Sequence, residues 1–255
     1  MAALPRLKAV YFDLDDTLCG YWDASKKALR QAFEAHPIEG YTSEEMVEHW
    51  AAAFREYAPT LKGTESYQVY LKNGKPTRDE QMGHTLRRVG VDDARHAEAL
   101  GDTYGAMRNA NLRLFEDALE VLTALKASHP LGVITNGPAD IQRQELETLD
   151  LEKWFDHVFI EGELGIGKPN RIVFEKAENV VGAKPEELLF VGNSYAHDIR
   201  PAINFGWHTA WIRRDSDVPP SVAGQTTKPE SKPEGAPEPT FVIHQLRDLL
   251  DIVQL

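Results

Sequence analysis

The stretch Asp13-Leu14-Asp15-Asp16-Thr17 follows an apolar run from Leu7 to Phe12 and decides the fold. A short, continuous apolar run of this kind predicts a buried strand. Two carboxylates at positions i and i+2 after a central strand can converge above the carboxyl edge of a parallel sheet, where α/β proteins bind ligands. There Asp13 can attack phosphorus, Asp15 can protonate the leaving oxygen, and both can hold magnesium. An isolated Asp-x-Asp pair suits a capping turn equally well, so the interpretation depends on later residues.

Three further motifs follow in a consistent order. Ile134-Thr135-Asn136-Gly137 ends a second apolar run, Gly165-Ile166-Gly167-Lys168-Pro169 comes next, and Phe190-Val191-Gly192-Asn193-Ser194 is followed by Asp198. In this order and context, the four motifs resemble those of the haloacid dehalogenase (HAD) superfamily. The resemblance covers roughly residues 5–20 and 113–213, and the stretch between them is similar only in length and helical character to the helical cap of subfamily I members.

The motifs assign the catalytic roles. Asp13 is expected to be the nucleophile that forms an aspartyl-phosphate, which splits hydrolysis into two easier displacements. Asp15 is expected to act as general acid for the departing alcohol and then as general base for water. Lys168, in a glycine-rich loop, can neutralise both Asp13 and the phosphoryl oxygens.

The second motif is expected to bind the phosphate group. Thr135 can donate its hydroxyl to a phosphate oxygen. Asn136 and Gly137 can add backbone N–H groups where a helix is predicted to begin at Pro138, because a helix N-terminus favours anions.

Mg²⁺ is the expected cofactor, since it prefers an all-oxygen site that retains water. The expected ligands are Asp13, Asp15, Asn193 and Asp198, and in the family the position of Asp15 also contributes its backbone carbonyl. The fourth motif departs from the common form, which has an aspartate where Asn193 stands. Our hypothesis is a working site of weaker metal affinity in which Asp198 carries more of the binding. The competing interpretation is a damaged site.

Composition bounds the class of protein. The chain has 255 residues with 42% hydrophobic and 27% charged content, enough for an α/β core plus a smaller domain. The net charge of −12 argues against nucleic acid or an anionic membrane as partner. The single cysteine, Cys19, excludes an internal disulfide and suits the cytoplasm. The N-terminus shows no signal peptide or membrane span.

The periodicity predicts the organisation. Residues 20–112 show helical spacing without a strand signal, which predicts an all-α cap inserted after the first strand. Helix–strand alternation from Phe115 predicts an α/β fold, a Rossmann-like parallel sheet with helices on both faces, in a core domain of residues 1–19 and 113–255. Residues 215–240 contain six prolines and predict a flexible surface insertion, with a binding segment as the less favoured alternative.

Together these features predict a Mg²⁺-dependent phosphatase acting on a small phosphorylated metabolite, as monomer or homodimer. Tyr21 and Trp22 either line the pocket mouth or pack as core. A 2-haloacid dehalogenase is disfavoured, because displacing halide needs neither the acid Asp15 nor the metal ligand Asp198. A phosphomutase remains an alternative. A non-catalytic binding protein has only Asn193 in its favour.

Overall fold

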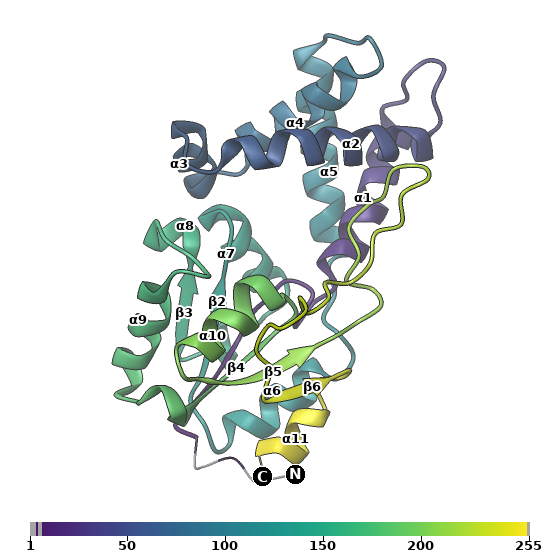
Figure 1. Ribbon diagram of the computed structural model, residues 1–255. Helices are drawn as coiled ribbons and strands as arrows, with labels where there is room; N and C mark the ends of the chain where they lie inside the picture. Colours follow the sequence, from purple (N-terminus) through teal and green to yellow (C-terminus); the bar gives the residue numbers. More distant parts are fainter. Residues whose placement is uncertain (1–3, 5–6, 254–255) are drawn as a thin grey trace.

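The computed structural model describes residues 4 and 7–253. A six-stranded, all-parallel sheet forms its centre, in the order β3-β2-β1-β4-β5-β6 (Figure 1). The strands are β1 (Ala9–Phe12), β2 (Leu131–Thr135), β3 (His157–Ile160), β4 (Leu188–Gly192), β5 (His208–Ile212) and β6 (Phe241–Ile243). This confirms the predicted α/β class with a Rossmann-like parallel sheet.

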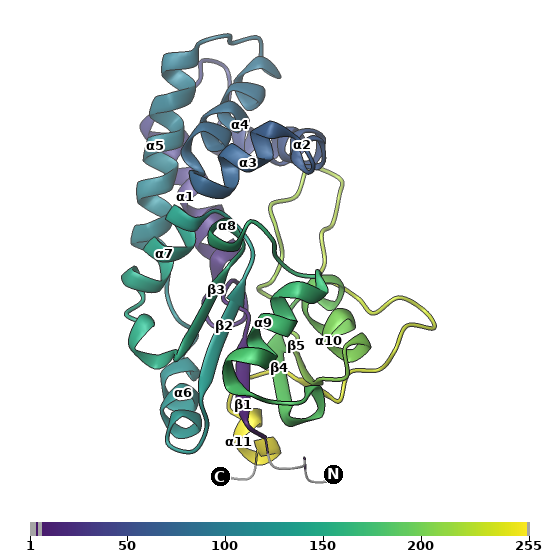
Figure 2. The ribbon, with the colours of Figure 1, turned by 90° about the vertical axis from the view of Figure 1, so that its left-hand side faces the viewer.

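Alternate side chains of the buried strands point to opposite faces and build two cores. From β1, Val10 and Phe12 join the core under α6, α7 and α11, while Ala9 and Tyr11 join the core under α9 and α10 (Figure 2). These helices are α6 (Ala118–Lys126), α7 (Ala139–Thr148), α9 (Arg171–Val181), α10 (Arg200–Asn204) and α11 (Asp248–Val253). Helices therefore cover both faces, as predicted.

Five helices form a separate bundle above the carboxyl edge of the sheet (Figure 1). They are α1 (Tyr21–Ala35), α2 (Ser43–Leu61), α3 (Glu65–Lys72), α4 (Lys75–Arg87) and α5 (Ala94–Asn111). Leu29, Trp50 and Leu100 belong to the bundle's own hydrophobic core. Residues 20–112, all of them described, hold no strand, as the periodicity predicts. A capping box begins α2, since Thr42 and Glu45 each accept the other's backbone N–H.

The order of the strands places the motif loops together. β1 has β2 on one side and β4 on the other, so the chain connections diverge from it in opposite directions. The loops that follow β1, β2 and β4 therefore meet at the carboxyl edge, beneath the bundle (Figure 1). A short helix, α8 (Glu161–Leu164), follows β3 at the same edge.

The last two helices of the chain each follow an irregular turn. After β4 the chain forms a π-helical turn, Tyr195–Ile199, which is followed by α10. The closing helix, α11, starts at Asp248, whose carboxylate accepts the N–H groups of His244 and Gln245.

The segment 215–240 lacks helix and strand, as predicted, but it is not a detached surface insertion. It runs from the core up to the bundle (Figures 1 and 2). Arg55 of α2 donates to the carbonyl of Pro220 over 2.8 Å, and Val222 packs against the bundle core. Among residues 4 and 7–253, no helix combines the length and apolar character that crossing a bilayer requires.

Gly162 of α8 lies where the bundle and the core pack closely. A Cβ there would lie 2.1 Å from the carbonyl oxygen of Leu71 in α3 and 2.3 Å from the backbone nitrogen of Ala139 in α7. We expect Gly162→Ala to lower the free energy of unfolding by about 2 kcal/mol, because backbone on both sides must move. Urea unfolding measures this.

Gly20→Ala is the matched control, since its Cβ would meet only ordinary contacts of 3.8 Å or more. We expect its effect to stay within about 0.5 kcal/mol. Equal effects of the two substitutions would contradict the close-packed junction.

Candidate active site

A buried cation joins the first, third and fourth motifs. Lys168 Nζ lies 2.6 Å from Asp13 Oδ1 and 2.7 Å from Asp198 Oδ1. The three side chains are almost completely buried. Burial alone would lower the pKa of Lys168, but Asp13 and Asp198 outweigh it and raise the pKa, so the ammonium keeps its charge. The structure thus brings together three residues that the sequence places 155 and 30 positions apart.

Asp198 is held as a partner of this lysine. Its second oxygen, Oδ2, accepts the backbone N–H of Ser194 over 3.0 Å. Burial raises the Asp198 pKa to about 7, with Lys168 opposing the rise. The sequence predicts Asp198 as a main metal ligand, whereas the structure engages both of its oxygens with protein donors.

Thr17 connects Asp13 to the fourth motif. Its hydroxyl oxygen lies 3.1 Å from Asp13 Oδ2 and 3.2 Å from Asn193 Oδ1, so its single proton can go to either acceptor. The amide oxygen of Asn193 and a carboxylate oxygen of Asp13 are therefore both within reach of the same hydroxyl group. Thr17 stands in the motif that decides the fold, yet no role for it follows from the sequence.

Asp15 accepts a hydrogen bond from Gln142 Nε2 of α7 over 3.1 Å. Burial, followed by the nearby charge of Asp13, raises the Asp15 pKa to about 6. A carboxyl group with that pKa can both give and take a proton near neutral pH.

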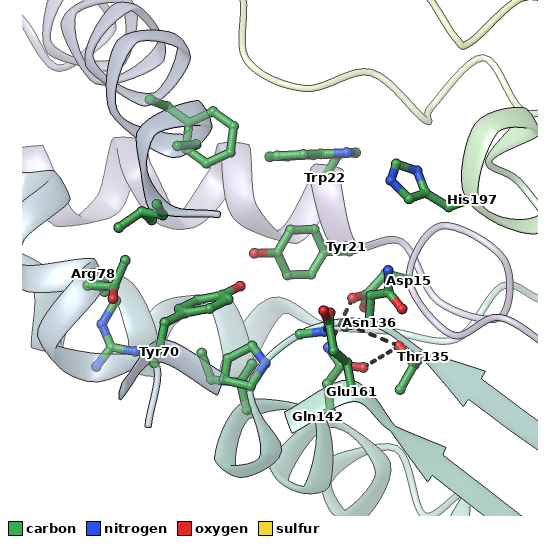
Figure 3. A pocket seen from close by; sticks show the side chains of 18 of the residues that line it. Asp15, Tyr21, Trp22, Tyr70, Arg78, Thr135, Asn136, Gln142, Glu161 and His197 are labelled. Carbon is green, nitrogen blue, oxygen red and sulfur yellow. Dashed lines mark hydrogen bonds between the residues drawn. The ribbon is translucent and has the colours of Figure 1, made fainter. Parts of the chain in front are cut away.

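The second motif is tied to protein groups rather than left open. Thr135 is buried, and its hydroxyl donates to Gln142 Oε1 over 2.6 Å (Figure 3). The Asn136 amide exchanges two 2.8 Å bonds with the backbone of Lys168, which fixes the lysine loop. Gly137 N donates to the Glu161 carboxylate over 3.2 Å. Before Thr135 or Gly137 can donate to a phosphate, each must leave its present partner.

Three buried side chains near Asp15 are missed by the sequence patterns. Glu145 of α7 accepts from Gln142 Nε2 over 2.9 Å and lies 3.7 Å from Arg108 Nη2 of α5. Burial and Asp15 raise the Glu145 pKa well above its ordinary value. Gln142 and Glu145 share one face of α7 at i and i+3, which is the only sequence signal that could have found them.

Asp16 adds to the crowding of acids. It is buried at a φ of 57°, and its Oδ1 accepts the backbone N–H of Trp22 over 3.1 Å. Burial and the charge of Asp217 raise its pKa to about 9. Cys19 is fully buried, and burial raises the pKa of its thiol.

The oxygen donors suit a magnesium ion. Among the described residues, no group of three or more His, Cys, Asp and Glu side chains is arranged to hold a metal. The oxygen donors beside Thr17 are of two kinds, namely the carboxylate of Asp13 and the amide oxygen of Asn193. Mg²⁺ commonly takes one or two carboxylates and completes its shell with water and substrate phosphate. These residues fit that pattern.

A cavity of about 830 Å³ opens between the motif loops and the bundle (Figure 3). Residues of all four motifs line the cavity, among them Asp13, Thr135, Lys168 and Asp198. Tyr21 and Trp22 line it as well, and Trp22 also packs against the bundle core, so that both alternatives hold for Trp22. Aromatic side chains from the bundle surround the remainder: Trp50, Phe54, Tyr57, Tyr67, Tyr70 and Tyr104.

Comparison with known proteins agrees with this geometry. A family model described as haloacid dehalogenase-like hydrolase matches residues 7–206, and one described as HAD-hydrolase-like matches residues 165–249. The chain therefore belongs to the haloacid dehalogenase-like hydrolases.

Two curated relatives of the chain are named as phosphatases. The chain is 30% identical over 250 residues to glyceraldehyde 3-phosphate phosphatase of Methanopyrus kandleri, covering 97% of each chain. It is 26% identical over 219 residues to N-acylneuraminate-9-phosphatase of Rattus norvegicus, covering 85% of this chain and 86% of the relative. The prediction of an enzyme of the phosphatase type within this family is confirmed.

Solved structures share the fold. The putative HAD-hydrolase YfnB of Bacillus subtilis, solved bound to magnesium, has a TM-score of 0.70 and 21% identity, covering 98% of this chain and 100% of its own. L-2-haloacid dehalogenase of Xanthobacter autotrophicus has a TM-score of 0.69 and 23% identity, covering 97% and 98%.

The raised pKa of Asp16 has a consequence for stability. Between pH 3.8 and about 9 the folded state keeps a proton that the unfolded state has lost, so the wild type loses stability as pH rises. Asp16→Asn removes this titration, keeps an acceptor for Trp22 N, and tolerates the positive φ. We expect the variant's advantage in unfolding free energy to be at least about 1 kcal/mol larger at pH 8 than at pH 5.

Urea unfolding in metal-free buffer at the two pH values measures this difference. An advantage that does not grow with pH would show that Asp16 is already ionised in the folded protein.

Proposed function

We propose that the chain hydrolyses phosphate monoesters of small molecules through an aspartyl-phosphate on Asp13, with Mg²⁺ as cofactor. The observation that carries the proposal is the pair of carboxyl groups after β1. Asp13 is held against the buried ammonium of Lys168, while Asp15, two residues on, has its pKa raised to about 6. One group is thereby suited to attack and the other to transfer protons.

In the first step, a carboxylate oxygen of Asp13 attacks phosphorus and the bond from phosphorus to the ester oxygen breaks. Asp15 gives its proton to that oxygen, so the alcohol leaves neutral. In the second step, Asp15 takes a proton from water as the water oxygen attacks the same phosphorus. The bond to Asp13 breaks and inorganic phosphate leaves. Lys168 offsets negative charge throughout.

Mg²⁺ would neutralise phosphoryl charge and help to align the phosphate with Asp13. Asp13 and Asn193 would hold it, together with the backbone carbonyl of Asp15 that the family resemblance implies. The all-oxygen character of these donors supports this assignment, as does the magnesium-bound relative of the same fold.

We assign residues 20–112 as a cap domain and residues 1–19 and 113–255 as the core domain. The separate hydrophobic core of the bundle supports the division, and the cavity that lies between the two parts supports a covering role. Such a cover keeps bulk water out and contacts the leaving group. The single cysteine suits a cytoplasmic enzyme.

The cavity favours a leaving group with a planar, apolar part. Aromatic rings of the bundle contribute to its lining, and among them Trp50 and Phe54 are stacked with centroids 5.1 Å apart. A volume of about 830 Å³ exceeds what a three-carbon phosphate needs. We therefore propose a phosphate ester of an aromatic or heteroaromatic alcohol or nucleoside as substrate class.

Dehalogenase activity is disfavoured although a solved dehalogenase shares the fold. Displacing halide from carbon does not require a proton donor to the leaving group. Because the pKa of Asp15 is raised, its carboxyl group can carry the proton that a leaving oxygen needs. This favours an oxygen leaving group over halide.

The nucleophile is tested by Asp13→Asn. We expect magnesium-dependent hydrolysis of 1-naphthyl phosphate by the wild type, and a loss of at least about 10³-fold in kcat for the variant, because an amide cannot form the acyl phosphate. Phosphate release measures it.

Asp251→Asn, an equal charge change on the exposed face of α11, serves as control and should retain activity. Substantial turnover by Asp13→Asn would overturn the proposed nucleophile. Equal turnover with and without Mg²⁺ would overturn the cofactor.

The substrate class is tested at Phe54, which lines the cavity and is 36% exposed, so that its truncation spares the bundle core. We expect Phe54→Ala to lower kcat/KM for 1-naphthyl phosphate about fivefold to tenfold, since one aromatic contact contributes about 1 kcal/mol. The value for glycerol 3-phosphate should not change.

Val69→Ala is the control, because Val69 is exposed on α3 outside the cavity. A parallel loss on both substrates, or a preference of the wild type for glycerol 3-phosphate, would contradict the aromatic substrate class.

A further inference from the structure

The segment 215–240 reaches the residue at which this chain departs from its family. Asn193, which stands where the common motif has an aspartate, donates from Nδ2 to Asp217 Oδ2 over 2.8 Å. Asp217 is half-buried and belongs to the proline-rich segment between β5 and β6. The motif thus lacks a carboxylate at this position, and the segment supplies one that is bonded to the amide standing there.

We propose that Asp217 is a positioning residue of the magnesium site. It holds the Asn193 amide with its oxygen toward Asp13, and it restores negative charge beside the neutral amide. The inference rests on the proposed function, because it concerns the Mg²⁺ that the proposed reaction uses.

The orientation of the amide is the first part of the argument. An amide presents an acceptor at one end and two donors at the other. Without Asp217, the carboxylate of Asp13 would attract the NH₂ end of Asn193, and that end cannot bind a cation. A carboxylate such as that of Asp217 can bond only the NH₂ end of the amide. It therefore keeps Nδ2 outward and leaves Oδ1 beside Thr17, whose hydroxyl also reaches Asp13 Oδ2.

Charge is the second part. A hydrogen bond from Nδ2–H to a carboxylate polarises the amide and increases the negative charge on its oxygen. Outer partners of this kind orient metal ligands and tune their donor strength, and their removal commonly costs about 10–100-fold in metal affinity. Among the described hydrogen-bond partners of Asn193, which are Thr17, Trp211 and Asp217, it is Asp217 that carries a formal charge.

The segment is anchored well enough to fix Asp217. Glu230 of the same segment accepts from Ser194 Oγ over 2.9 Å and from the backbone N–H of Ala196 over 3.0 Å. Tyr195 donates its hydroxyl to the carbonyl of Pro237 over 2.6 Å. Residues 193–196 are therefore each bonded to the segment.

The backbone of Asn193 is fixed as well, because its carbonyl accepts from Trp211 Nε1 over 2.7 Å. Because the backbone is held, the Asn193 side chain can change only by rotation of its amide group. The hydrogen bond to Asp217 fixes that rotation.

The test is a calorimetric titration with Mg²⁺ alone. We expect Asp217→Asn to weaken Mg²⁺ binding at least tenfold relative to wild type, because the new amide can present either end to Asn193. Asp215→Asn, the same charge change at an exposed position two residues earlier, is the matched control and should stay within about twofold of wild type. Melting curves establish that the variants are folded.

The same change in an Asn193→Asp background gives the decisive comparison. With aspartate at both positions, two carboxylates face each other, so removal of the charge at Asp217 should leave Mg²⁺ affinity unchanged or raise it. A loss that is equal in both backgrounds, or equal for Asp215→Asn, would overturn the inference.

The outcomes also separate the inference from the proposed function. Mg²⁺ binding by wild type that Asp217→Asn leaves intact would overturn the inference alone. Absence of Mg²⁺ binding in every variant, Asn193→Asp included, would overturn the magnesium-dependent function and the inference together.

Discussion

The ammonium group of Lys168 is almost fully buried between the carboxylates of Asp13 and Asp198, 2.6 and 2.7 Å away. Three loops, after β1, β3 and β4, must meet for these atoms to touch. Removal of Lys168 would leave two buried carboxylates without their cation, and an uncompensated buried charge costs about 3–5 kcal/mol. The parallel sheet and its central β1 can be understood as the frame that this contact requires, and the amide of Asn136 fixes the lysine loop from the neighbouring strand.

One lysine does not balance the acids around it. Burial and mutual repulsion raise the pKa values of Asp15, Asp16 and Asp198 to about 6, 9 and 7. Excess negative charge is expected where a divalent cation and a phosphate are to bind together, since the cation offsets both. The same excess explains why Gly137 N–H is covered by Glu161, which a phosphate must displace.

Periodicity in the sequence predicts the sheet and the helical insertion. The motif resemblance points to Asp13, Lys168 and Asp198 as site residues, but it assigns Asp198 to the metal rather than to Lys168. The sequence does not predict the partners that come from elsewhere. Arg108 reaches Glu145 from the bundle, and Asp217 reaches Asn193 from a segment without periodicity. Such contacts depend on tertiary placement, and a proline-rich composition predicts an exposed loop whether or not its carboxylates are bonded.

The central claim is that Asp13 carries the phosphoryl group during turnover. Rapid acid quenching of the enzyme with Mg²⁺ and 1-naphthyl phosphate, followed by peptide mass spectrometry, tests it most directly. The account predicts a phosphoryl group on the peptide of β1, located on Asp13 and absent when Asp13→Asn is quenched in the same way. Release of phosphate with no phosphorylated enzyme at any quench time, or a phosphoryl group on another residue, would contradict it.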